Sequence, residues 1–120
     1  MGTQISFTRY ENDLIREFRN RLNGAESVED VHQVFDLAIR ELFLRVFGDR
    51  FRWQPDDVSL NADQQASVQI HGRLLQTEAF ADAWHNSDLS SIVDRLAQSA
   101  GHRAVHLEKR REKTAQKFRR

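Results

Sequence analysis

The chain has 120 residues, of which 39% are hydrophobic and 30% charged, and its formal net charge is zero. This length and composition predict one globular domain rather than a disordered chain. The absence of cysteine excludes disulfides, thiolate catalysis and cysteine-based zinc sites. No segment has the roughly 20 apolar residues of a membrane helix, and the first residues lack a secretory-signal pattern. We therefore expect a soluble, cytoplasmic protein with no membrane partner.

The zero net charge conceals an asymmetry between the two ends of the chain. Residues 1–101 contain ten Arg, no Lys and 16 Asp and Glu, which gives a net charge of −6. Residues 102–120, here called the basic segment, contain eight Lys and Arg and two Glu, which gives +6. This split predicts either a basic arm for an anionic partner or a tail that contacts the acidic part of the protein.

The first predicted element is an amphipathic helix over residues 8–22. Leu14, Phe18 and Leu22 lie on one helical row, Ile15 lies beside them, and charged residues occupy the other face. The following Asn-Gly pair is a typical helix end.

Residues 27–47 have the clearest helical pattern in the chain. Ser27 followed by Asp30 resembles a capping box, with Asp in place of the usual Glu. Leu37 and Leu44 lie on a different face from the main apolar stripe, so we expect this helix to be covered on more than one side. The main stripe consists of Val31, Val34, Phe35, Ala38, Leu42 and Val46. The helix is therefore predicted to form the centre of the core.

The next part of the chain, from residue 49 onward, breaks the helical pattern. It contains the only proline, Pro55, followed by the short segments DVSLN (57–61) and ASVQIHG (66–72). Their β-branched and alternating residues predict a hairpin, and Gly72 permits a second turn.

Residues 74–84 fit two different patterns. Strict alternation favours a strand, with Leu75, Thr77, Ala79, Ala81 and Ala83 on one side. The cluster of Phe80, Ala83 and Trp84 and the Ala and Glu content favour a helix instead. We prefer the strand by a small margin and keep the helix as the alternative.

The last predicted element is one long helix over residues 88–120. Gly101 interrupts it at a cost of about 1 kcal/mol relative to Ala. Its apolar stripe consists of Leu89, Ile92, Val93, Leu96, Ala100, Ala104 and Leu107. The stripe fades beyond this point, so we expect residues 1–107 to form a single compact α+β domain and residues 108–120 to form a basic helical extension. The predicted fold has two N-terminal helices, a small antiparallel sheet or hairpin, and a long C-terminal helix with a basic end.

The basic segment supplies the strongest functional candidates. On a helix, Lys109, Lys113 and Lys117 share one row, and Arg103, Arg110 and Lys117 share another. Lys and Arg neutralise phosphates and release counterions without reading sequence. A solvated helix end or a contact with an acidic protein surface are the alternatives, and Phe118 is the only aromatic residue available for stacking. The candidate nucleic-acid-binding residues are Arg103, Lys109, Arg110, Arg111, Lys113, Lys117, Arg119 and Arg120.

Two histidines in the same region have the spacing of helical metal ligands. His102 and His106 stand four residues apart, but Arg103 occupies the position where a zinc protease has its Glu. His85 or Asp82 would have to supply a third ligand, and no spacing specifies either. We therefore expect no metal and no cofactor, and two partly exposed histidines.

Other residues carry weaker signals for a site. Asp56, Asp57 and Asp63 lack the spacing of a calcium loop, and Glu78 and Asp82 are not accompanied by a nucleophile or base. No Gly-rich phosphate loop or nucleophile elbow is present. Phe51 and Trp53 are expected to cover the edge of the core. The sequence therefore favours a protein that is not an enzyme.

Residues 66–113 resemble the C-terminal part of the ribosome hibernation-promoting factor family. That family has a short strand ending in Gly, a strand of alternating Ala and acidic residues, and a helix with a basic end. The counterparts here are VQIHG, LQTEAFADA and SIVDRLAQ…HLEKRREK, and VEDVHQVFDLAIRELFLRVFGDRF resembles the first helix of the family. The resemblance implies an α+β fold that binds small-subunit ribosomal RNA. The positions that match the basic helix end of the family are Arg103, Lys109, Arg110, Arg111 and Lys113.

Together these patterns predict a small non-enzymatic binding protein. Its basic C-terminal helix is expected to contact an anionic partner, with RNA or a ribonucleoprotein such as the ribosome preferred. The alternative is a protein–protein interaction or assembly module whose basic helix docks on an acidic surface of a partner or of its own dimer mate.

Overall fold

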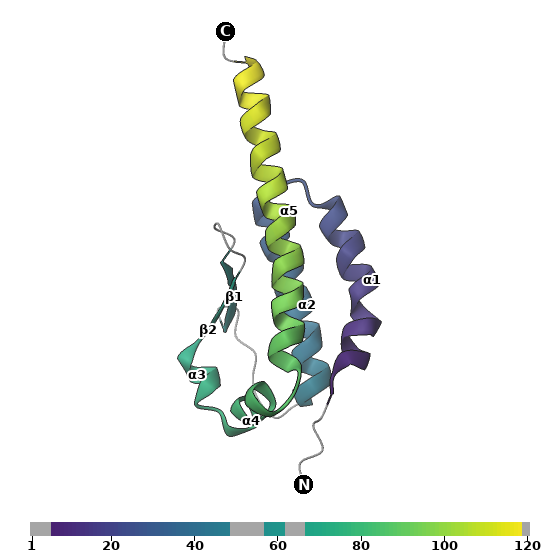
Figure 1. Ribbon diagram of the computed structural model, residues 1–120, viewed down its shortest axis with the longest axis vertical. Helices are drawn as coiled ribbons and strands as arrows, with labels where there is room; N and C mark the ends of the chain where they lie inside the picture. The colour runs from purple at the N-terminus through teal and green to yellow at the C-terminus, as the bar shows by residue number, and fades with distance from the viewer. Residues whose placement is uncertain (1–5, 49–56, 62–66, 119–120) are drawn as a thin grey trace.

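The computed structural model describes residues 6–48, 57–61 and 67–118, with the backbone alone described for 61, 67 and 111–118. Three long helices lie side by side, and a small sheet and two short helices cover one side and one end of them (Figure 1). The elements are α1 (Thr8–Gly24), α2 (Val28–Phe47), β1 (Val58–Asn61), β2 (Ser67–Ile70), α3 (Gly72–Leu75), α4 (Glu78–Asn86) and α5 (Leu89–Phe118). The predicted fold class, α+β with two N-terminal helices, a small antiparallel sheet and a long C-terminal helix, is confirmed.

The first two helices begin and end close to where the sequence predicts. The hydroxyl of Ser27 accepts a hydrogen bond from the backbone N–H of Asp30 at 3.1 Å, so the expected N-cap of α2 is present. Gly48 ends α2 with φ of +57°, a backbone conformation that residues with a side chain rarely adopt. In α1 the predicted row of Leu14, Phe18 and Leu22 is buried.

The prediction that Leu37 and Leu44 are covered is wrong, because their exposed fractions are 51% and 56%. At 100° per residue, both point to the side of α2 opposite its buried face. α1, α5 and β1 all pack on one broad half of α2. That half contains Val31, Phe35, Ala38, Ile39, Leu42, Phe43, Val46 and Phe47.

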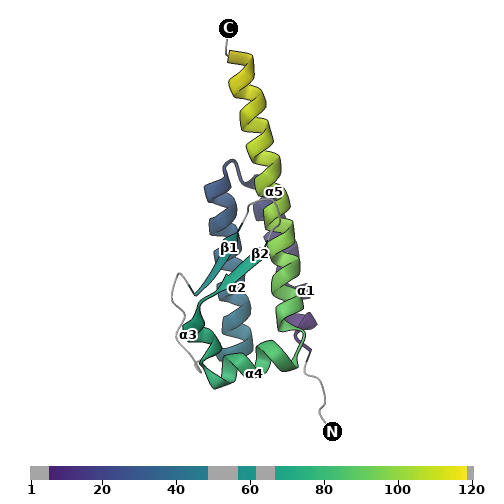
Figure 2. The same ribbon diagram turned by 60° about the vertical axis from the view of Figure 1, so that its left-hand side comes forward.

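The predicted hairpin is present as an antiparallel pair of strands, with Val58 opposite Ile70 and Leu60 opposite Val68. The strands lie against α2 and α5 (Figure 2). The buried carboxylate of Asp57, just before β1, forms an ion pair with the guanidinium of Arg73 on α3. This contact ties the base of the hairpin to the helices that follow.

The preferred strand over residues 74–84 is wrong, and the helical alternative holds. α4 runs across the lower ends of α2 and α5 (Figure 2), and Phe80 is fully buried there. The Phe80 ring packs 5.6 Å from that of Phe43, 5.7 Å from that of Phe47 and 5.4 Å from that of Trp84. A helix places residues 80 and 84 on one side, one turn apart. The contacts of Phe80 with the aromatic side chains of α2 therefore favour a helix, although the alternating sequence pattern favours a strand.

α5 packs against α1, α2 and both strands. Every member of its predicted stripe is buried, from Leu89 at its start to Leu107. Beyond that level Glu108, Lys109 and Arg110 are exposed, and the helix backbone continues past the other elements (Figure 1). Among the residues that the structure describes, none of the helices combines the length and apolar character needed to cross a membrane.

Three polar contacts hold α1 parallel to α5. At the start of both helices, the Asp88 carboxylate accepts hydrogen bonds from the Phe7 N–H and the Ser6 hydroxyl at 2.7 Å, and from the Thr8 hydroxyl at 2.9 Å. Farther along, Arg95 donates two hydrogen bonds, of 2.8 and 2.9 Å, to the carboxylate of Glu11.

The third contact lies at the end of α1. Arg103 donates hydrogen bonds to the backbone carbonyl oxygens of Asn23 and Ala25, at 3.2 and 3.0 Å. The three α5 residues that make these contacts, Asp88, Arg95 and Arg103, are seven and eight positions apart and share one side of the helix.

Two of these groups have shifted pKa values. Burial alone would raise the pKa of Asp88, but the hydrogen bonds from Phe7, Ser6 and Thr8 outweigh it and lower the pKa below the ordinary 3.8. The hydrogen bonds with Glu11 raise the pKa of Arg95, against the opposing effect of burial. Both shifts favour the charged forms that join α1 to α5.

We expect Arg95→Ala to lower the free energy of unfolding by about 2 kcal/mol, between the values typical of buried and of exposed ion pairs. The Glu11 side chain is only 11% exposed, so the substitution leaves a nearly buried carboxylate without its partner. Urea denaturation measures the change. Arg21→Ala is the matched control, because it removes an ion pair whose Glu17 side chain is 63% exposed. Equal losses in the two variants would contradict the role given to Arg95.

We expect Asp88→Asn to destabilise the protein near neutral pH by about 1–2 kcal/mol, because an amide cannot accept three hydrogen bonds as a charged carboxylate does. Since the folded pKa of Asp88 is lowered, its contribution is complete above the unfolded pKa and is lost as pH falls through the folded pKa. As the pH falls below about 4, the free energy of unfolding should therefore decrease less in the variant than in the wild type. Thermal unfolding across this range tests this, with Asp94→Asn on the exposed side of α5 as the control; identical profiles for both variants would refute it.

Candidate nucleic-acid interface

The basic segment continues α5 beyond the level at which the other helices end. The side chains of Lys109 and Arg110 are exposed on this part of the helix. Arg111, Lys113 and Lys117 follow on the same continuous helix backbone, which extends to residue 118. Arg119 and Arg120 lie outside the described residues.

One face of α5 carries most of the basic positions. Residues 102, 106, 109, 113 and 117 are separated by four, three, four and four positions, so an α-helix places all five within a narrow arc. These are His102, His106, Lys109, Lys113 and Lys117, and we call this row the basic stripe. It extends about 22 Å along the helix axis.

Arg103 has a different environment from the other candidate residues. It is half-buried, and its guanidinium is engaged by the carbonyl oxygens of Asn23 and Ala25 at the end of α1. A cation at this place satisfies carbonyl groups that a helix end leaves without partners and complements the helix dipole. The structure thus gives Arg103 a contact within the protein, where the sequence suggested a contact with phosphate.

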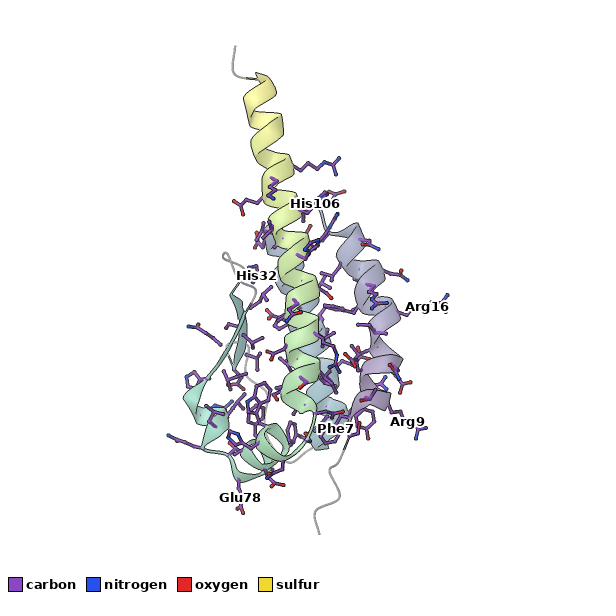
Figure 3. All side chains as sticks on the ribbon, in the orientation of Figure 1. Phe7, Arg9, Arg16, His32, Glu78 and His106 are labelled. Atoms are coloured by element: carbon purple, nitrogen blue, oxygen red, sulfur yellow. The ribbon has the colours of Figure 1, made fainter. Side chains whose placement is uncertain are left out.

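A groove of about 620 Å³ lies between α1 and α5 at the inner end of the basic stripe. Its walls include Arg19, Leu22 and Asn23 of α1 and His102, Arg103 and His106 of α5. No carboxylate is among the described side chains that line it. Figure 3 shows His106 on α5 near the end of α1. We call this feature the α1–α5 groove.

Sequence reasoning did not identify Arg19 and Asn23 as site residues. They stand about 80 positions from the histidines, and their spacing on an amphipathic helix is that of ordinary exposed residues. Only the parallel packing of α1 on α5 brings them to the same groove as His102 and His106.

An acidic hollow of about 600 Å³ lies on α4, at the other end of the helical body from His106 (Figure 3). Its lining includes Glu78, Asp82 and His85, and Asp82 accepts a hydrogen bond of 2.8 Å from the side-chain amide of Asn86. His85 and Asp82 thus lie apart from the groove that holds His102 and His106. Across the described part of the chain, no three His, Asp or Glu side chains form a group that could hold a metal ion.

Of the remaining candidate residues, one makes a structural contact and the others lie at positions that the structure does not describe. Asp57 is buried and paired with Arg73. Phe51, Trp53, Asp56 and Asp63 lie outside the described residues, as does Pro55.

Comparison of the chain with protein-family models, with curated proteins and with solved structures found no match. Any function inferred for this protein therefore depends on the placement of charge in its structure. The features that carry it are the exposed basic end of α5 and the α1–α5 groove beside it.

We expect Arg103→Gln to lower the free energy of unfolding by about 1–2 kcal/mol, because the α1 carbonyl oxygens lose a charged donor. Lys109→Gln, six positions farther along α5 and exposed, should change it by no more than about 0.5 kcal/mol. Urea denaturation of the two variants makes the comparison. A loss in Arg103→Gln as small as that in Lys109→Gln would show that the guanidinium does not stabilise the end of α1.

Proposed function

We propose that this protein binds RNA without catalysing a reaction, and that the basic end of α5 supplies the contacts with phosphate. The observation that carries the proposal is the projection of this end beyond an acidic body. Lys109 and Arg110 are exposed just past the last buried residue of the stripe, Leu107. A helix with cations in this position neutralises phosphates at little cost in desolvation.

The arrangement supports backbone contacts more than base recognition. From position 102 to position 117 the chain has no Phe, Tyr or Trp that could stack on a base. Contacts made by Lys and Arg with phosphate fix position and affinity but carry no sequence information. The proposed binding is therefore electrostatic and tolerant of sequence.

The absence of catalysis in this proposal is supported by the roles of the titratable groups. Asp88 and Arg95, whose pKa values are shifted, both join α1 to α5. Perturbed groups at a structural contact do not assemble the nucleophile, base and orienting residue that a catalytic site needs.

The ribosome is the more specific partner that we propose, on the resemblance to the hibernation-promoting factor family. The segments whose sequences resemble the first helix of that family and its helix with a basic end are helical here, as α2 and α5. The segment LQTEAFADA, which resembles a strand of the family, is instead largely helical, as α4. Co-sedimentation with ribosomal small subunits at low salt tests this narrower proposal.

We expect the triple substitution of Lys109, Arg110 and Lys113 by Gln to weaken binding of single-stranded RNA about tenfold or more at low salt. If each of the three residues neutralises one phosphate, the slope of log affinity against log salt should fall by about 2. Fluorescence anisotropy with a labelled oligoribonucleotide at several salt concentrations measures both quantities.

The matched control replaces Arg9, Arg16 and Arg40 by Gln, which removes the same charge from the body. These side chains are exposed, and Figure 3 shows Arg9 and Arg16 pointing outward from α1. Equal weakening in both triple variants would mean that net charge, not the basic end of α5, controls binding. A wild-type protein that binds no RNA at low salt would refute the proposal and favour the alternative, docking on an acidic protein surface.

A further inference from the structure

The α1–α5 groove is continuous with the basic stripe. His102 and His106 line the groove, and Lys109 follows His106 by three positions on the same face of α5. Positions 113 and 117 extend that row away from the body. An anionic chain that follows the stripe toward the body therefore arrives at the groove.

The composition of the groove suits an anion. Arg19 on α1 and Arg103 on α5 supply guanidinium groups to its walls, and Asn23 and the two histidines add groups that can donate hydrogen bonds. The absence of carboxylates from its described lining contrasts with the hollow on α4, which includes Glu78 and Asp82. Of these two surface depressions, the α1–α5 groove therefore has the lining that better suits an anion.

Arg103 adds a donor that the protein itself does not use. One terminal nitrogen of its guanidinium bonds the carbonyl oxygens of Asn23 and Ala25. Its Nε is buried and has no hydrogen-bond partner among the described residues. A buried N–H without a partner is costly, so an acceptor oxygen that reached it would be favourable.

We propose that the α1–α5 groove is a phosphodiester-binding subsite for single-stranded RNA, and this inference rests on the proposed function. The strand runs along the basic stripe, and one of its phosphates enters the groove between Arg19 and His106. A single strand fits better than a duplex, because its flexible backbone can leave the line of the helix and enter a groove between two helices.

The experiment compares the full-length wild type with a groove variant, Arg19→Gln combined with His106→Gln. Both residues are exposed, and neither makes a contact on which the fold depends among those described above. The matched control is Arg40→Gln combined with His85→Gln, which replaces the same residue types at exposed positions on α2 and α4. Fluorescein-labelled oligouridine is the probe, and affinity is measured by anisotropy at low salt.

We expect the groove variant to bind oligouridine about tenfold more weakly than the wild type, which corresponds to about 1.4 kcal/mol. The control should bind within about twofold of the wild type, since its charges lie away from the stripe. In a second measurement, the imidazole NMR signals of His102 and His106 should shift when oligouridine is added, and the signal of His85 should not.

Two negative results have different meanings. If the groove variant binds like the wild type and the His102 and His106 signals do not move, while the triple substitution in the basic end abolishes binding, the groove is not a subsite and the proposed function stands. If the wild type binds no oligouridine, the proposed function and the groove proposal both fail.

Discussion

The parallel attachment of α1 to α5 by three charged contacts sets where the helical body ends along α5. Asp88, Arg95 and Arg103 fix the start, the middle and the end of α1 against one side of α5. Hydrogen bonds that involve charged groups are stronger and more directional than apolar contacts, so they set how far along α5 the first helix lies. With α1 in place, α2 returns antiparallel between the two helices and buries its broad apolar half against both.

This arrangement also determines where the proposed RNA-binding surface begins. α1 ends at the level of Arg103, and the first turn of α2 starts near the same place (Figure 1). None of the described elements covers α5 beyond Leu107, so the helix leaves the body at the position where its sequence becomes basic. Arg103 bonds the end of α1, and the basic stripe continues along α5 from the same level. The α1–α5 groove and the basic stripe are therefore adjacent.

Much of this fold could be predicted from local patterns, whereas the exceptions involve contacts between distant segments. The alternation around Ala79 and Ala81 favoured a strand, but the contact of Phe80 with Phe43 and Phe47 favours a helix. A pattern of neighbouring residues contains no information about this contact, because both phenylalanines lie more than 30 positions away in the chain. Leu37 and Leu44 were expected to be covered because they make α2 apolar on more than one side, and such a helix is usually covered on more than one side. They are exposed because all of the partners of α2 pack on its other half.

Local periodicity is enough to predict the two N-terminal helices, the hairpin, the long last helix and the point where its apolar stripe ends, because each follows from the spacing of neighbouring residues. The separation of charge between the body and the basic segment can also be read directly from the sequence. Packing between distant segments, in contrast, accounts for the contact of Arg103 with the end of α1, for the helix over residues 78–86, and for the groove that Arg19 shares with His102 and His106. These outcomes depend on packing between residues tens of positions apart, and the spacing of residues along one helix carries no information about its neighbour in space.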